Sequence, residues 1–132
     1  MRNPKKKALI VEGDRLTGRE LAAVLSNAGF ETCEVMAHED PVLQAELEQP
    51  SVIIVDMATP GMDGFAAFKA LRESHQTDKI PIIALTDGDR SGGIYYTEED
   101  FEAAFDVHGP EGIIEKPIDA RFLMTCVMGV LG

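Results

Sequence analysis

The segment VIIVDMATPGMDG (residues 52–64) consists of four apolar residues, the acid Asp56 and a turn that contains Pro60, Gly61 and Gly64. A continuous apolar run of this length is typical of a strand that is covered on both faces of a parallel sheet. Burying an acid without a partner is unfavourable, so a carboxylate at the end of such a strand needs a counter-charge. Because ligands bind beyond the carboxyl ends of strands in open parallel sheets, the segment predicts that Asp56 lies in a binding site.

Apolar runs of strand length recur along the chain and alternate with helical patterns. The run at residues 30–35 alternates between apolar and polar side chains, which is typical of an edge strand, whereas the runs before and after it are continuous. This alternation of strand and helix predicts a parallel sheet with right-handed connections. The expected strands are residues 7–11, 30–35, 51–55, 80–85 and 112–115.

The helical segments carry recognisable start and stop signals. The first has an apolar stripe that ends at Gly29, a residue suited to a C-terminal cap. Asp40 and Pro41 predict an N-cap and a first helical residue for a second helix that runs to about Glu48. A capping-box pattern at Thr97 predicts the fourth helix. The residues expected on buried helix faces are Leu21, Val24, Leu25 and Ala28; Phe65, Phe68 and Leu71; Phe101, Ala104 and Phe105; and Phe122, Leu123, Val127 and Val130.

Length and composition restrict the class of protein. The 132 residues fit one domain, residues 1–132, with residues 1–6 as a basic lead-in to the first strand. The net charge of −11 opposes nucleic-acid binding, because phosphate contacts need clustered Lys and Arg. The apolar run after Lys5, Lys6 and Lys7 is too short for a signal peptide, and no run could span a membrane, so we expect a cytoplasmic protein.

The two cysteines predict neither a disulfide nor a metal site. Cys33 and Cys126 lie far apart and have no CxxC or histidine-rich spacing around them. Buried free thiols are therefore the expected state of both.

Polar residues follow four of the expected strands. Glu12 follows the first strand, Asp56 the third and Thr86 the fourth, and Lys116 comes directly after the fifth. Taken singly, each of these residues is more typical of a helix cap or a solvated side chain. Their joint occurrence predicts one convergent site, in which carboxylates face a divalent cation and a lysine neutralises the remaining charge. Hard oxygen ligands suit Mg²⁺, and such a site suits phosphoryl transfer.

These residues resemble the receiver domain of bacterial two-component response regulators. The resemblance covers nearly the whole chain and implies a flavodoxin-like (CheY-like) doubly wound fold: a five-stranded parallel sheet in the order 2-1-3-4-5, flanked by five helices. The segments that carry it are ALIVEGDRLTGRELAAVLSNAGFE (8–31), VIIVDMATPGMDGFAAFKALR (52–72), IPIIALT (80–86) and IIEKPID (113–119). The second and fourth of these segments are the most specific.

The resemblance also implies a role for each site residue. Asp56 accepts a phosphoryl group from a histidine kinase or a histidine phosphotransfer protein, Thr86 senses the group by hydrogen bonding, and Lys116 pairs with it. The Lys116-Pro117 bond is cis in this family. The implied Mg²⁺ ligands are Glu12, Asp56 and the main-chain carbonyl of Ala58, with Asp14 as an alternative.

The sequence departs from the family pattern at three places. The acid pair after the first strand is reduced, because Gly13 follows Glu12; Glu12 then reaches the metal or Asp14 swings in, and we favour Glu12 because Asp14 suits the N-cap. This loss predicts weak Mg²⁺ binding and slow phosphorylation. Ile113 replaces the usual aromatic residue three positions before the lysine.

The third departure is an enlarged loop between the fourth strand and the fourth helix, residues 87–97. Thr86 and Lys116 are 30 positions apart, and the excess falls here, around the flexible pair Gly92-Gly93. Tyr95 and Tyr96 either replace the missing aromatic residue and dock a partner, or anchor the loop to the sheet.

The favoured function is a receiver that signals by binding a downstream protein or another domain of its parent chain. A pseudo-receiver that acts as a phosphorylation-independent scaffold or homodimerisation module is the alternative, supported by Gly13 and Ile113. A phosphatase would need a second acid two residues after its nucleophile, where this chain has Ala58, so we expect no turnover of an external substrate.

Overall fold

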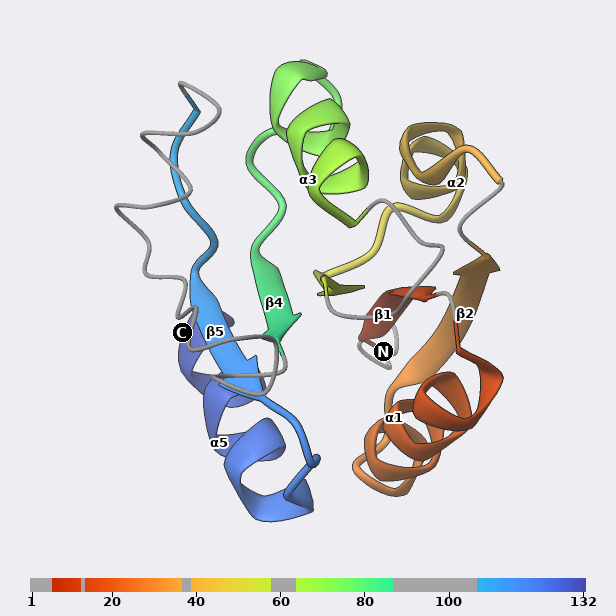
Figure 1. Cartoon of the computed structure of the whole chain (residues 1–132), viewed down its shortest axis with the longest axis vertical. Helices are drawn as coiled ribbons and strands as arrows, with labels where there is room; N and C mark the ends of the chain where they lie inside the picture. The colour runs from red at the N-terminus through yellow and green to blue at the C-terminus, as the bar shows by residue number, and fades with distance from the viewer. Residues whose placement is uncertain (1–5, 13, 37–38, 58–63, 87–106) are drawn as a thin grey trace, which may run out of the picture.

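The computed structural model describes residues 6–12, 14–36, 39–57, 64–86 and 107–132 and contains one parallel sheet (Figure 1). The five strands lie in the order β2-β1-β3-β4-β5, which confirms the expected topology. All four neighbouring pairs are parallel. The strands are β1 (Lys7–Glu12), β2 (Glu31–Met36), β3 (Val52–Asp56), β4 (Ile82–Thr86) and β5 (Gly112–Glu115).

The described residues form four helices, α1 (Arg15–Asn27), α2 (Pro41–Glu48), α3 (Gly64–Glu73) and α5 (Ala120–Val130). The expected helix from Thr97, with its three apolar residues, lies outside the described residues. Asp40 caps α2 as predicted, since its side chain accepts hydrogen bonds from the amides of Val42 and Leu43. None of these helices is long and apolar enough to cross a lipid bilayer.

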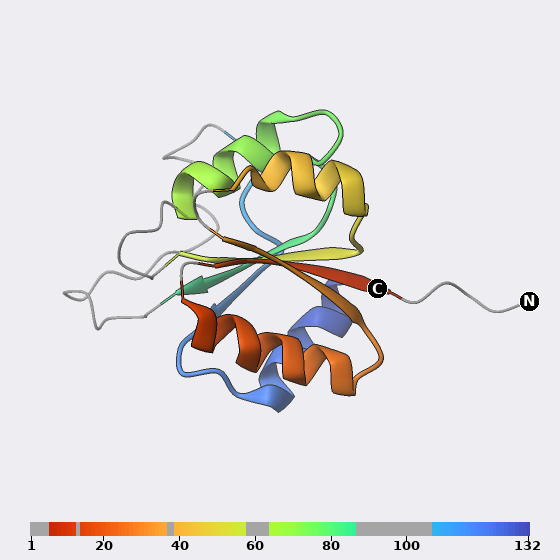
Figure 2. The ribbon, with the colours of Figure 1, turned by 90° about the vertical axis from the view of Figure 1, so that its right-hand side faces the viewer.

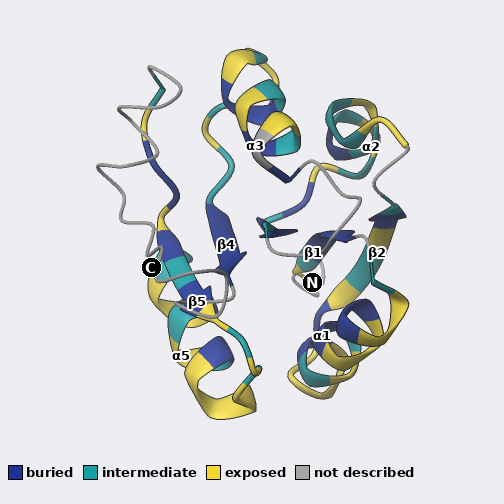
Figure 3. Cartoon of the chain, in the orientation of Figure 1, coloured by how far each residue is buried: buried dark blue, intermediate teal, exposed yellow. Residues whose placement is uncertain are grey.

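The helices cover the sheet on both faces (Figure 2). Helices α1 and α5 pack on one face, and α2 and α3 pack on the other. Strands β3 and β4 are buried along their whole lengths, as Figure 3 shows, because each has a neighbour on both edges and helices above and below. Strand β2 lies at the edge of the sheet, as its alternating pattern predicts.

Among the described residues expected on buried helix faces, six are buried, Val24 and Val130 are half-buried, and two are exposed. Phe68, Leu71, Leu21 and Leu25 are fully buried, whereas the side chain of Phe65 lies outside the described residues. Phe122 is 55% exposed, because it lies about 100° around the helix from its buried neighbour Leu123. Ala28 is exposed because it is the C-cap residue, where the helical stripe has already ended.

A buried arginine joins α3 to the amino-terminal ends of β4 and β5. The Arg72 guanidinium donates to Glu111 Oε1 at 2.6 Å, and the same oxygen accepts a hydrogen bond from the Ile82 amide at 2.7 Å. The Cζ atom of Arg72 also lies over the Phe68 ring, 5.3 Å from the ring centroid. Its other acceptors are the main-chain carbonyls of His108, Asp78, Ile80 and Gly109. Arg72 therefore holds this end of the sheet together, opposite the end where Asp56 lies.

Replacing Arg72 by alanine should lower the free energy of unfolding by about 3 kcal/mol or more, because several buried acceptors lose their donor. Chemical denaturation followed by circular dichroism measures this change. Lys69→Ala is the matched control, since Lys69 is exposed on the same helix. An equal effect of the two substitutions would show that the buried contacts of Arg72 contribute little.

Candidate phosphoacceptor site

The polar residues identified at the strand ends lie at one edge of the sheet. Glu12, Asp56 and Thr86 are the last residues of β1, β3 and β4, and all three are buried. Lys116 follows the last residue of β5 directly. Since all the strands are parallel, these four residues occupy the same carboxyl edge, as expected.

Asp56 and Lys116 form a buried ion pair. Lys116 Nζ lies 3.0 Å from Asp56 Oδ2, and the side chain of Asp56 has no exposed surface while that of Lys116 is 17% exposed. The Lys116 amide donates a 2.7 Å hydrogen bond to the Thr86 carbonyl, which fixes the lysine against the end of β4. The Lys116-Pro117 bond is cis, as the resemblance implied. The ammonium therefore provides the counter-charge that a buried carboxylate needs.

The end of β3 is also fixed by its two neighbours. The Met57 amide donates to the Leu85 carbonyl at 2.8 Å, so pairing with β4 continues past Asp56. Gly64 begins α3 directly against this backbone: a Cβ at that position would lie 2.5 Å from the Asp56 carbonyl oxygen and 2.9 Å from Met57 Cα. Because these atoms belong to the main chain, any other residue at position 64 would push α3 away from the site.

Within the described residues, Glu12 is buried with no cation at ion-pair distance. It is 1% exposed, and its Oε2 atom accepts no hydrogen bond. Its carboxyl group lies against Gly18 of α1. The pKa of Glu12 is raised from its ordinary value of 4.5 to about 7, chiefly by burial and in addition by the charge of Glu34, a hydrogen bond with the Glu34 side chain, and the charges of Asp14 and Asp56.

Asp14 has the capping role that the sequence predicts. Its side chain accepts a hydrogen bond from the Leu16 amide and another from the Thr17 hydroxyl, both at 3.0 Å. Both carboxylate oxygens of Asp14 are therefore engaged in capping α1, which argues against a role for Asp14 as the replacement metal ligand.

The described part of the site does not fit a complete Mg²⁺ shell. Within the described ranges, no three His, Cys, Asp or Glu residues are grouped so that they could hold a metal ion. The Glu12 carboxyl faces α1, and Asp56 already binds Lys116. Ala58, whose carbonyl is the third expected ligand, lies outside the described residues, as does Gly13.

Two further expectations concern the surroundings of the site. Ile113 is half-buried and packs against the core on the α2 and α3 face, so β5 carries an aliphatic residue at the position where the family usually has an aromatic one. The loop at 87–97, with Tyr95 and Tyr96, lies outside the described residues.

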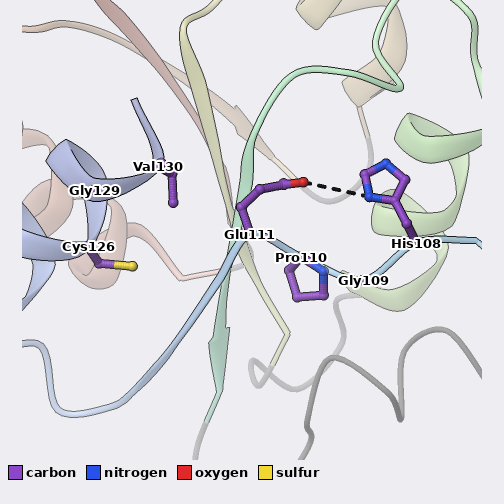
Figure 4. A pocket seen from close by; sticks show the side chains of 7 residues that line it. All are labelled: His108, Gly109, Pro110, Glu111, Cys126, Gly129 and Val130. Carbon is purple, nitrogen blue, oxygen red and sulfur yellow. Dashed lines mark ion pairs between the residues drawn. The ribbon is translucent and has the colours of Figure 1, made fainter. Parts of the chain in front are cut away.

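A hollow lies at the amino-terminal end of β5, away from the end of the sheet that carries Asp56 (Figure 4). It has a volume of about 540 Å³, and His108, Glu111 and Cys126 are among its lining residues. His108 Nδ1 and Glu111 Oε2 are 3.6 Å apart. Since His108 and Glu111 precede β5, this hollow belongs to the amino-terminal end of the strand and takes no part in the Asp56 site.

Both cysteines are free, as expected, but they are half-buried rather than fully buried. Burial raises the pKa of both thiols. Cys33 donates to Glu48 Oε1 at 3.3 Å, which adds to the rise in its pKa. Both side chains therefore stay protonated at neutral pH.

Comparison with known proteins identifies the family. The family model of the response regulator receiver domain matches residues 8–128. The chain is 26% identical to protein PilH of Pseudomonas aeruginosa, over 95% of this chain and 97% of PilH. It is 35% identical to the transcriptional activator protein IrlR of Burkholderia pseudomallei, over 95% of this chain and 50% of IrlR. The chain belongs to the response regulator receiver domain family.

A solved structure supports the fold. The receiver domain of a sensor histidine kinase from Pseudomonas aeruginosa PAO1, which has a magnesium ion coordinated in its active site cleft, superimposes with a TM-score of 0.78. The alignment covers 98% of this chain and 99% of that domain, at 22% identity. At this identity the likeness establishes the arrangement of strands and helices.

Gly18, Glu34 and Arg72 were not singled out by sequence reasoning. An isolated glycine in a helical pattern usually has a packing reason, so the sequence could have indicated a close contact at Gly18. Nothing in the local sequence marks Arg72 or Glu34, because their importance comes from contacts with residues distant in the sequence.

The raised pKa of Glu12 predicts a pH-dependent stability. A carboxyl whose pKa is higher in the folded state stabilises the fold fully below pH 4.5, and this contribution is lost as the pH rises through about 7. As the pH rises from 5 to 8, the free energy of unfolding of Glu12→Gln, measured in urea, should therefore increase by about 2 kcal/mol relative to that of the wild type. Glu20→Gln, on the exposed side of α1, is the control and should follow the wild-type profile. Parallel profiles for the wild type and Glu12→Gln would contradict the buried position of Glu12.

Proposed function

We propose that Asp56 is the phosphoacceptor of this receiver domain. The observation that supports it is the buried Asp56–Lys116 ion pair at the carboxyl edge of the sheet. In the proposed transfer, a carboxylate oxygen of Asp56 attacks the phosphorus of a phosphohistidine. The P–N bond breaks, an acyl phosphate forms, and the leaving imidazole nitrogen takes a proton from water.

Lys116 and Thr86 respond to the new group. The acyl phosphate carries more negative charge than the carboxylate, so the ammonium of Lys116 is attracted to the phosphoryl oxygens. Thr86 lies at the end of the neighbouring strand, where its hydroxyl can donate to the same oxygens. The two side chains thus distinguish the phosphorylated from the unphosphorylated form, and this difference in contacts shifts the equilibrium between conformations.

The proposed partners follow from this chemistry. The phosphoryl donor is a histidine kinase or a histidine phosphotransfer protein, and the output is binding to a downstream protein, to a domain of the parent chain or to a second copy. The net charge of −11 supports the absence of direct nucleic-acid contacts by this domain. This chain matches half of the transcriptional activator protein IrlR. The proposal on nucleic acid concerns the matched receiver domain alone.

Phosphorylation should be lost in Asp56→Asn and retained in the wild type. Incubation with Mg²⁺ and a small phosphodonor, followed by intact-protein mass spectrometry, should show one phosphoryl group on the wild type and none on the variant. Asp14→Asn is the matched control, because Asp14 caps α1 and is expected to leave labelling intact. If the wild type gains no label at any Mg²⁺ concentration, the scaffold function replaces the present proposal.

We also propose that Mg²⁺ binds this domain weakly. The cation supplies charge neutralisation for a phosphoryl group in such sites. The support here is the reduced acid pair at Glu12 and Gly13, together with a Glu12 carboxyl that lies against α1.

Gly13→Asp should strengthen Mg²⁺ binding by about tenfold or more, because it restores a carboxylate ligand. Isothermal titration calorimetry on the wild type and the variant measures the affinity, and Gly13→Asn controls for the change in side-chain size. Micromolar affinity of the wild-type protein would show that the lost ligand is already replaced.

A further inference from the structure

A glycine lies inside α1 where its small size has a specific consequence. Gly18 is the fourth residue of the helix, and glycine is among the least favourable residues in a helix interior. A Cβ built on Gly18 would overlap the Cδ and both carboxyl oxygens of Glu12. Glu12 therefore fills the space that the missing side chain leaves, and we call this space the Gly18 notch.

The Gly18 notch determines the direction of the Glu12 side chain. Alternate residues of a strand face opposite sides of a sheet, and Ala8 and Ile10 belong to the core on the α1 and α5 face. Glu12 continues this series and extends over the first turns of α1. Its carboxyl group borders a hollow of about 240 Å³ between α1 and β2, whose other lining residues include Arg15, Arg19 and Glu34.

No cation among the described residues stabilises the Glu12 carboxylate in this position. Its Oε2 atom accepts no hydrogen bond, no described cation lies within ion-pair distance, and the hydrogen bond between the Glu12 and Glu34 side chains requires a proton on one of the two acids. The notch beside Gly18 supplies the space that lets the Glu12 carboxyl lie against α1. Asp56 meanwhile binds Lys116, and no three His, Cys, Asp or Glu residues in the described ranges are grouped so that they could hold a metal ion.

We propose that Gly18 is a positioning residue that keeps the Glu12 carboxyl out of the Asp56 site and thereby weakens Mg²⁺ binding there. The inference rests on the proposed function, because it concerns the metal at the phosphoacceptor. A side chain at position 18 closes the notch. The Glu12 carboxyl then has to leave α1, and a divalent cation at Asp56 attracts it.

Gly18→Ala tests the proposal, with Gly129→Ala as the matched control. Gly129 lies in α5, and a Cβ there would meet no atom within 4 Å, so its substitution changes helix propensity alone. Isothermal titration calorimetry should show Mg²⁺ affinity raised about tenfold in Gly18→Ala and unchanged in Gly129→Ala. The gain should vanish in Gly18→Ala/Glu12→Gln, which lacks the carboxylate. Wild-type affinity in a folded Gly18→Ala protein, or a gain that survives Glu12→Gln, would overturn the proposal.

Glu12→Asp provides a second test that leaves α1 unchanged. Its side chain is one methylene shorter and falls short of the Gly18 notch, so its Mg²⁺ affinity should rise as well. Adding Gly18→Ala to Glu12→Asp should bring no further gain, because the notch is then already empty. If Gly18→Ala does not fold, unchanged affinity in Glu12→Asp overturns the proposal.

A crystal structure of Gly18→Ala gives a direct readout. The Glu12 carboxyl should lie outside the first turns of α1, and a carboxyl that still contacts residue 18 would contradict the proposal. Labelling of Asp56 by a phosphodonor is measured separately on the same variants. Metal affinities that change as expected without any labelling would refute the proposed function and leave the role of Gly18 intact.

Discussion

The Asp56–Lys116 ion pair is the interaction on which the site depends. A carboxylate with no exposed surface is strongly destabilised unless a cation or several donors accompany it. Lys116 Nζ meets Asp56 Oδ2 at 3.0 Å, so the negative charge is retained inside the protein at the edge of the sheet. The same charge is the one that a phosphoryl transfer reaction would use as its nucleophile. Removing either partner takes away the counter-charge that the other has in the ion pair.

The rest of the fold holds these two residues in place. Asp56 ends a strand that is buried along its length, and its main chain lies in close contact with Gly64 of α3. Lys116 is fixed through its amide to the carbonyl of Thr86. At the far end of the sheet, Arg72 ties α3 to β4 and β5, so that the strands carrying the site are fixed at both ends. A short, directional reach from Lys116 to Asp56 needs this rigidity, since a shift of the strands by a fraction of an ångström would lengthen the ion pair.

The other acid of the site has a different environment. Glu12 lies in the Gly18 notch, where no cation among the described residues accompanies its carboxyl as Lys116 accompanies Asp56. Two carboxylates at the same edge of the sheet are thus in different situations, one balanced by an ammonium and one favouring its neutral form. A receiver domain built in this way relies on Lys116 more than on acidic metal ligands for charge balance. In this respect the site differs from one in which several acids share one cation.

The sequence by itself determined the succession of strands along the chain and their parallel pairing, the caps at Asp14 and Asp40, and the edge of the sheet that carries Asp56, Thr86 and Lys116. These features follow from local patterns, because apolar runs, capping residues and the parallel connection rule act over short stretches of chain. The tertiary structure alone decided that Phe122 is exposed, that Arg72 collects acceptors from two segments (78–80 and 108–111), and that the Glu12 carboxyl lies against Gly18. The direction of a side chain depends on which helix packs beside it and how closely, and that packing is set by contacts between residues far apart in the chain.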